Sequence, residues 1–221
     1  MFISLDGVMQ APGGPDEDPA GGFAHGGWVP AYWDDDLSEA MNETFKAPFD
    51  LLLGRKTYDI FAAHWPYAEQ EIAADDFEAL NNDIARTFNR ITKYVATHSP
   101  ETLTWKGSVP LGDDPAATLR DLKTQDGPDL FVQGSSDFSQ TLLQNDLIDE
   151  MQLLIFPLTL GKGKRLFGEG AMPAAFRLTG SSITTNGVII ARYVRDGAVK
   201  TGSFAFEEPT EAEMERRRGL E

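Results

Sequence analysis

The feature that most constrains the fold of this chain is the order in which strand-like and helix-like segments follow one another. Short apolar runs alternate with amphipathic segments up to residue 147, and only strand-like segments follow from residue 148 to about residue 195. Such alternation is typical of a mostly parallel sheet with helices on its faces. Near the end, Asn186-Gly187 separates two strand-like runs, which is the strongest short-range signal for a hairpin. The order therefore predicts an α/β fold with a mostly parallel sheet and an antiparallel C-terminal hairpin.

Local signals mark where several helices should begin. Three aspartates, 34–36, stand at the start of one amphipathic segment, where capping and the helix dipole both favour them. Asp114 followed by Pro115 combines a capping residue with a proline suited to a first helical turn. We therefore expect helices over 34–45, 56–61, 77–88 and from 115 and 136 onwards, and strands over 2–5, 49–53, 91–97, 130–133, 151–160, 176–185 and 188–195.

Charge and composition exclude several classes of protein. The 221 residues include 35 Asp and Glu against 19 Lys and Arg, and the resulting net charge of −16 repels nucleic acid and anionic membrane surfaces. The absence of cysteine excludes disulfides, a thiolate metal site and a cysteine nucleophile. Neither a signal peptide nor a membrane-length apolar run is present in the sequence, so we expect a cytoplasmic protein.

No internal repeat or linker divides the chain, and we expect one domain over 1–206 followed by a charged tail over 207–221. One long segment, 10–32, is too rich in glycine and proline to form regular structure. A loop of this length is either a functional lid or a solvated insertion, and the sequence leaves both interpretations open.

Two junctions after expected strands have the composition of anion-binding sites. Gly54-Arg55-Lys56-Thr57 places two cations at a helix N-terminus, where they oppose the helix dipole unless an anion such as phosphate joins them. Gly134-Ser135-Ser136 sets a glycine and hydroxyls beside free helical N–H groups, which suits a diphosphate. The alternatives are a solvated basic pair and ordinary serine capping. The basic loop 160–168 is a third candidate, either as a phosphate contact or as a solvated turn.

The sequence indicates no metal site. His25, His64 and His98 lack the helical spacing of zinc ligands, and there is no cysteine to join them. The acidic runs 16–18 and 34–36 lack the spacing of an EF-hand loop. We therefore expect chemistry that does not depend on a bound metal.

Five segments, taken in order, resemble the motifs of one known family. They are Ser4-Leu5-Asp6-Gly7-Val8-Met9, Leu51-Leu52-Leu53-Gly54-Arg55-Lys56-Thr57-Tyr58, Gly134-Ser135-Ser136, Asp149-Glu150 and Pro157-Leu158-Thr159-Leu160-Gly161-Lys162-Gly163-Lys164-Arg165-Leu166-Phe167. The chain resembles, over about 2–195, the dihydrofolate-reductase-like family that includes the reductase domain of bifunctional riboflavin-biosynthesis deaminase–reductases. The resemblance implies a doubly wound sheet, NADPH as the hydride donor and a homodimer.

Carried over motif by motif, the resemblance implies a set of cofactor-binding residues. In this set serines stand where dihydrofolate reductase tends to have glycines, which leaves the backbone contacts possible but alters the loop. The residues implied are Gly54, Arg55, Lys56 and Thr57 at the cofactor phosphates, Thr97, His98 and Ser99 beside the adenosine 2′-phosphate, and Gly134, Ser135 and Ser136 under the diphosphate.

The same resemblance suggests catalytic and substrate-binding candidates. Dihydrofolate reductase holds its pterin with a carboxylate at the start of the first helix, where this chain has Asp34-Asp35-Asp36, and we take Asp36 as the candidate. Asp6, at the end of the first strand, is the second candidate, although capping alone would account for the aspartates of the helix. Trp28 and Trp33 are candidates to stack on a planar heterocycle, with a place in the core as the alternative.

The function that the resemblance implies is an NADPH-dependent oxidoreductase that transfers hydride to a small heterocyclic molecule. Two substrate classes stay open, a 5-amino-6-(5-phosphoribosylamino)uracil-type riboside phosphate and a pterin or folate. Outside the enzymes, the alternative is a non-catalytic, dimeric ligand-binding module of the same fold.

Overall fold

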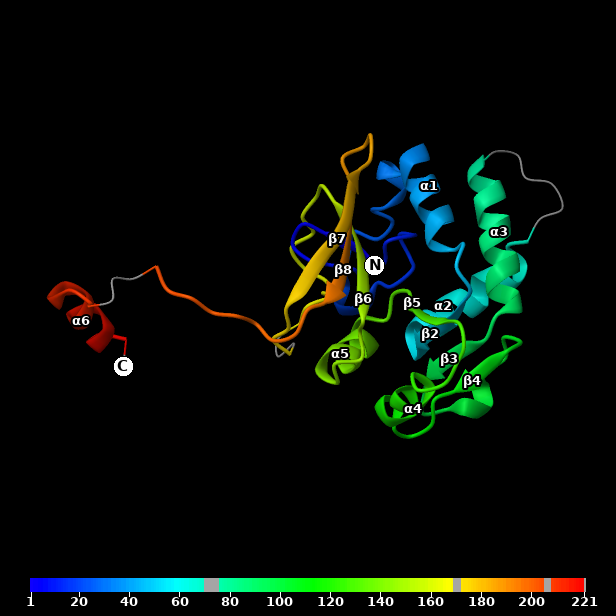
Figure 1. Ribbon diagram of the computed structural model, residues 1–221. Helices are drawn as coiled ribbons and strands as arrows, with labels where there is room; N and C mark the ends of the chain where they lie inside the picture. Colours follow the sequence, from blue (N-terminus) through cyan, green and yellow to red (C-terminus); the bar gives the residue numbers. More distant parts are fainter. Residues whose placement is uncertain (70–75, 169–171, 205–207, 221) are drawn as a thin grey trace.

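In the computed structural model, which describes residues 1–69, 76–168, 172–204 and 208–220, helices and strands alternate along the chain before a final hairpin (Figure 1). The predicted elements are present, and a short strand, β4, was not predicted. The strands are β1 (Phe2–Ser4), β2 (Phe49–Gly54), β3 (Lys93–Ala96), β4 (Ser108–Pro110), β5 (Asp129–Val132), β6 (Glu150–Phe156), β7 (Phe176–Ile183) and β8 (Ile189–Arg195). The helices are α1 (Asp35–Thr44), α2 (Arg55–His64), α3 (Asp76–Arg90), α4 (Pro115–Leu122), α5 (Ser136–Gln144) and α6 (Glu211–Arg218).

The strands pair into two four-stranded sheets. One sheet has the order β4-β3-β2-β5 and is parallel throughout. The other has the order β1-β6-β8-β7, with β1 and β6 parallel and the remaining pairs antiparallel. The predicted α/β class is therefore confirmed, but the strands do not form one continuous sheet, because β1 and β5 are both edge strands.

The C-terminal hairpin forms where Asn186-Gly187 predicts it. Gly187 has a φ of +80°, a backbone conformation that side-chain-bearing residues rarely adopt. Two backbone hydrogen bonds close the turn, from Thr184 N to Val188 O at 3.0 Å and from Gly187 N to Thr184 O at 2.9 Å. The backbone N–H of Asn186 donates to the Asp34 carboxylate at 2.8 Å, so the tip of the hairpin is held at the start of α1.

One cluster of buried side chains connects the two sheets. Leu51 and Leu53 of β2 belong to the same cluster as Leu154 and Phe156 of β6. Leu37 and Met41 of α1 complete the connection between the sheets. The sheets are therefore packed into one core, although among the described residues no strand of one sheet pairs with a strand of the other.

The segment after β8 runs away from the sheets towards α6 (Figure 1). Part of the predicted tail, residue 207 and residue 221, lies outside the described residues, and the division at 206 stays a prediction. In the part of the chain that the structure describes, no helix has the length and hydrophobicity needed to cross a membrane.

Candidate functional site

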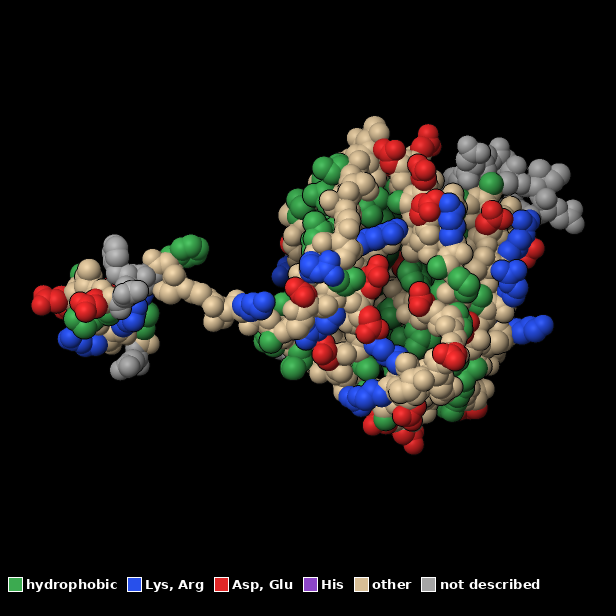
Figure 2. Space-filling model, in the orientation of Figure 1, with side chains coloured by type: hydrophobic (Ala, Val, Ile, Leu, Met, Phe, Trp, Pro, Cys, Tyr) green, Lys and Arg blue, Asp and Glu red, His purple; other side chains and the backbone are tan. Residues whose placement is uncertain are grey.

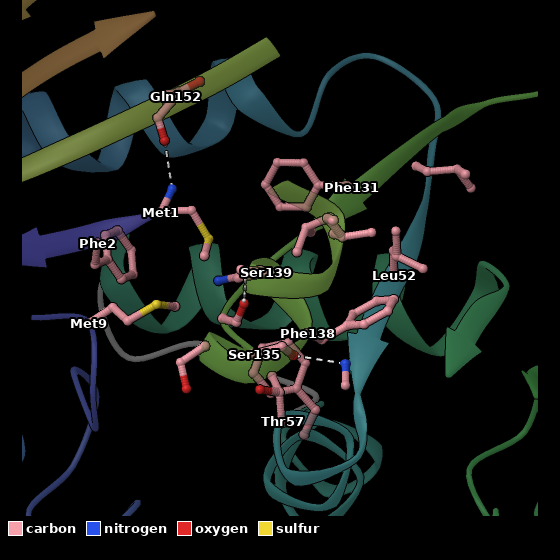
Figure 3. Close-up of a pocket in the computed structure, with 18 of the residues that line it drawn as sticks. Met1, Phe2, Met9, Leu52, Thr57, Phe131, Ser135, Phe138, Ser139 and Gln152 are labelled. Carbon is pink, nitrogen blue, oxygen red and sulfur yellow. Dashed lines mark hydrogen bonds between the residues drawn. The ribbon is translucent and has the colours of Figure 1, made fainter. Parts of the chain in front are cut away.

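A large cavity lies between the facing edges of the two sheets. Its volume is about 2060 Å³, and Figure 2 shows the molecule hollowed at this place. In Figure 3, apolar side chains converge on it from both sides: Met1, Phe2 and Met9 from the β1 side, and Leu52, Phe131 and Phe138 from the β2, β5 and α5 side. Apolar walls exclude water and strengthen the polar interactions that form inside.

The N-termini of two helices open onto this cavity without side-chain caps. Asp34 and Asp114 cap α1 and α4, each accepting a backbone hydrogen bond from the first turn. In contrast, no side-chain cap bond is present at Gly54 before α2 or at Ser135 before α5, and both residues line the cavity. The first N–H groups of α2 and α5 are consequently available to an anion in the cavity.

The two predicted phosphate loops touch each other. The backbone N–H of Gly54 donates to Ser135 Oγ at 2.8 Å, a bond drawn in Figure 3. Gly134 has a φ of +77°, and a Cβ at this position would lie 3.1 Å from Thr57 Cγ2. Glycine is therefore required at 134 for both its backbone conformation and its approach to α2. The side chain of Ser135 leaves α5 uncapped because it is used to join the two loops.

Arg55 contacts the second group of predicted cofactor-binding residues, the segment 97–99 after β3. Its guanidinium donates to Asp59 Oδ1 at 2.8 Å, to Thr102 Oγ1 at 2.6 Å and to Thr97 Oγ1 at 3.3 Å. A longer contact of 3.5 Å reaches the backbone carbonyl of Ser99. The negative charge of Asp59 partly offsets the unfavourable interaction between Arg55 and the dipole of α2, which the sequence indicated. The structure therefore brings the segment after β3 to Arg55, while the side chain of His98 is exposed and makes no described contact with it.

Gln133 is a cavity residue that the sequence analysis missed. It lies between the last residue of β5 and Gly134, and it lines the cavity. Its Oε1 atom is buried and has no hydrogen-bond partner among the described residues. An unpaired buried acceptor costs about 1–3 kcal/mol, but this oxygen is closed off from the cavity surface, so a donor on a ligand reaches it only after the side chain turns. A glutamine at a strand end carries no local sequence signal for such a role.

The two predicted tryptophans have different surroundings. Trp28 is buried, donates its indole N–H to Gln10 O at 2.9 Å and packs edge-on against Phe156. It is therefore a core residue, as the alternative interpretation held. Trp33 lines the cavity, with its indole N–H bonded to Ser38 Oγ at 2.8 Å, so its predicted role in substrate binding stays open.

The two predicted catalytic aspartates do not line the cavity. Asp36 accepts hydrogen bonds from the Thr185 hydroxyl and backbone N–H, which lower its pKa and hold the hairpin against α1. Asp6 accepts hydrogen bonds from Ser4 Oγ and from the backbone N–H groups of Leu160 and Gly161, which lower its pKa to about 2. These contacts give both carboxylates a structural role, and the geometry does not favour either as a proton donor.

The loop over 10–32 contains only short 3-10 turns, as its composition predicts. Its first part, including Asp16, Glu17 and Asp18, lines the cavity. Hydrogen bonds from Gly27 N to Ala11 O and from Val29 N to Pro12 O tie the beginning of the loop to its last residues. The loop is therefore internally bonded, and it brings carboxylates to the same cavity as the phosphate loops.

A comparison with known protein families shows to which family the chain belongs. Residues 1–190 match the family model described as the RibD C-terminal domain. The chain belongs to this family. The predicted resemblance to riboflavin-biosynthesis reductase domains is thereby confirmed.

Solved structures with similar folds include reductases. A putative riboflavin biosynthesis protein from Shewanella sp. PV-4 has a TM-score of 0.55 and 22% identity, covering 89% of this chain and 96% of that one. A dihydrofolate reductase from Enterococcus faecalis, complexed with NADP(H), has a TM-score of 0.52 and 13% identity, with coverages of 88% and 93%. A Thermotoga maritima diaminohydroxyphosphoribosylaminopyrimidine deaminase/5-amino-6-(5-phosphoribosylamino)uracil reductase has a TM-score of 0.54 and 17% identity, with coverages of 88% and 55%. At these identities the likeness establishes the dihydrofolate-reductase-like fold alone.

Proposed function

We propose that this protein is an NADPH-dependent reductase that transfers hydride to a small heterocyclic substrate in the cavity between the sheets. The proposal depends on one observation: the uncapped N-termini of α2 and α5 meet at a cavity, beside Arg55 and the threonine hydroxyls that it contacts. Membership of the RibD C-terminal domain family, whose structural relatives include an NADP(H) complex of dihydrofolate reductase, supports the choice of cofactor.

The residues present fit a phosphorylated dinucleotide. Free N–H groups at the starts of α2 and α5, together with Lys56, would bind the diphosphate. Arg55, with the hydroxyls of Thr97 and Thr102, would bind the 2′-phosphate. Arginine suits that role because its planar guanidinium forms charge-assisted hydrogen bonds with phosphate oxygens. When bound, NADPH supplies the hydride.

The chain's own residues would orient the substrate and exclude water. Side chains such as Phe131 and Phe138 form the apolar wall, and Gln133, whose Oε1 has no partner, would turn towards the substrate and accept a hydrogen bond from it. An acceptor at this place suits a ring N–H or an exocyclic amino group, which a 5-amino-6-(5-phosphoribosylamino)uracil-type molecule carries. A pterin carries the same groups, so we favour the riboside phosphate class because it appears in the name of the Thermotoga maritima reductase.

The test is a calorimetric titration of the protein with NADPH and with NADH at fixed ionic strength. We expect micromolar NADPH binding and weaker NADH binding. Arg55→Ala should weaken NADPH binding about 10- to 100-fold, since a hydrogen bond to a charged group contributes about 1.5–3 kcal/mol. NADH binding should change by less than about twofold, because NADH lacks the 2′-phosphate.

Arg120→Ala is the matched control, because Arg120 lies on the surface of α4 and bonds to Asn145, away from the cavity. It removes the same charge and should leave both affinities unchanged. If neither nucleotide binds the wild-type protein, the reductase proposal is rejected in favour of the non-catalytic module. If Arg55→Ala weakens both nucleotides equally, Arg55 does not contact the 2′-phosphate.

A further inference from the structure

The basic loop 160–168 has a rigid place beside the loop 10–32. Backbone hydrogen bonds join Met9 N to Lys164 O at 2.9 Å and Leu166 N to Gly7 O at 3.0 Å. Gly163 is packed so tightly that a Cβ there would lie 2.5 Å from Val8 Cγ1. The backbone that carries Lys164 is therefore held firmly against the residues after β1.

Gln10 joins the two loops from inside. Its side chain is buried, and its Nε2 donates to the backbone carbonyls of Asp18 and Ala20, each at 2.9 Å. Its Oε1 accepts a hydrogen bond from Lys164 N at 3.0 Å. One glutamine thus sets the positions of Asp18 and Lys164 relative to each other, so their meeting is built into the loop and does not depend on two flexible side chains alone.

Lys164, Asp18 and Lys56 all line the cavity. Lys164 Nζ forms an ion pair with Asp18 Oδ2, and the two side chains are only 24% and 19% exposed. Burial acts to raise the pKa of Asp18, but the hydrogen bond from Lys164, a backbone hydrogen bond from Ala20 and the charge of Lys164 together lower it, with the charge of Lys56 as the smallest contribution. Lys56 lines the same cavity and has no hydrogen-bonded partner among the described residues.

The neighbouring carboxyl group of Glu17 does not fully neutralise the charges of Lys164 and Lys56. Burial raises the pKa of Glu17, and the charge of Asp18 adds to this effect. Glu17 Oε2 already accepts hydrogen bonds from the backbone N–H groups of Gly13 and Gly14, at 2.6 and 3.1 Å. Asp18 is therefore the carboxylate that competes for Lys164 and Lys56, and moving it aside would leave two ammonium groups facing the cavity.

We propose that Lys164 and Lys56 form an anion subsite for a phosphate group of a ligand in the cavity, and that the Asp18 carboxylate is its internal competitor. The subsite extends the site of the proposed function, on which it rests. Lysine suits it because an ammonium group binds phosphate as a point charge without demanding one orientation. The phosphate belongs either to the diphosphate of the cofactor or to the substrate.

The test compares charge changes at matched positions by calorimetry in low salt. Lys164→Met should weaken NADPH binding about threefold to tenfold, whereas Lys162→Met, an exposed lysine two residues earlier, should change it less than twofold. Asp18→Asn should tighten binding about threefold, whereas Asp16→Asn, which removes the same charge from a residue of the same loop that also lines the cavity but forms no ion pair among the described residues, should have a smaller effect. Thermal unfolding of each variant checks that the loop stays folded.

A second titration identifies the source of the phosphate. Inorganic phosphate is titrated into the protein saturated with NADPH, and a loss of phosphate binding in Lys164→Met with NADPH affinity unchanged assigns the subsite to the substrate. If NADPH binds but neither titration distinguishes Lys164→Met from Lys162→Met, the subsite is refuted while the reductase proposal survives.

If NADPH does not bind at all, inorganic pyrophosphate replaces it as the probe. Pyrophosphate binding that depends on Lys164 then supports the subsite without the reductase, and its absence rejects both.

Discussion

Lys93 offers the sharpest test of the packing described above. This lysine is fully buried at the start of β3, and its Nζ donates to the backbone carbonyls of Phe88 and Ile91, each at 2.8 Å. It also lies 4.5 Å from the centre of the Trp105 ring. The ammonium group thus binds carbonyls at the C-terminal end of α3, where the helix dipole favours a cation.

We expect Lys93→Met to destabilise the protein by about 2 kcal/mol at pH 7. The variant loses two charge-assisted hydrogen bonds, each worth about 1.5–3 kcal/mol, and a cation–π contact worth about 1–2 kcal/mol. Against this loss stands the desolvation cost of the buried ammonium group, the same effect that lowers the pKa of Lys93 from 10.5 to about 8, so only part of the gross gain remains. Methionine carries no charge and therefore avoids that cost.

The lowered pKa of Lys93 also makes the difference depend on pH. In the unfolded chain the amine keeps its proton up to about pH 10.5, but in the folded protein only up to about pH 8. Between these values the unfolded chain binds more protons, so raising the pH stabilises the folded state. From pH 7 to pH 9.5 the wild-type protein should gain about 2 kcal/mol relative to Lys93→Met, which has no group to titrate there.

Urea unfolding at both pH values measures these differences, with Lys106→Met as the control. Lys106 is exposed and close in sequence, so its substitution should change the free energy of unfolding by less than about 0.5 kcal/mol. The slope against urea should be the same in all variants, which shows that the change lies in stability and not in the denatured state. A Lys93→Met variant as stable as the control, or a difference that is constant with pH, would refute the reasoning.

Two further predictions concern the loops around the cavity. Gly134→Ala should destabilise the protein by about 1–2 kcal/mol in urea unfolding and weaken NADPH binding, because the residue has a φ of +77° and its new Cβ would press on Thr57; an unchanged stability would show that the approach of α2 to α5 is not tight. Asp6→Asn should make the free energy of unfolding less sensitive to acid. The Asp6 carboxylate, with a pKa of about 2 in the folded protein, stabilises the fold fully above its unfolded pKa near 3.8, and this stabilisation is lost as the pH falls through 2. Acid titrations of folding followed by circular dichroism would measure this, and identical curves for the wild type and variant would contradict it.

The elements that could be predicted from the sequence are those with a local cause. Asp114 before Pro115 predicted the start of α4, and Asn186-Gly187 predicted the turn between β7 and β8. Each of these signals works through atoms only a few residues apart. The short strand β4 has no such signal, because it contains Pro110 and forms only by pairing with β3.

The parts of the site that could not be predicted depend on contacts between distant segments. Asp36 lies where a pterin-binding carboxylate was expected. However, its Oδ2 atom accepts hydrogen bonds from Thr185, which lies at the hairpin tip 149 residues later in the chain. Asp6 is likewise used by the loop at 160–161. The unpaired Gln133 oxygen became visible only once the surrounding chain was in place.

The negative charge of the whole chain makes the positions of its few cations informative. At a net charge of −16, long-range electrostatics oppose the approach of a phosphorylated ligand, although salt screens this repulsion beyond about 10 Å. Binding must then depend on contacts at short range, such as helix N–H groups and the ammonium groups of Lys56 and Lys164. Removing either Asp16 or Asp18 reduces the long-range repulsion by a similar small amount, but of these two carboxylates it is Asp18 that is paired with Lys164 in the cavity wall. A larger effect of Asp18→Asn than of Asp16→Asn therefore cannot come from net charge and has to come from the local competition for Lys164.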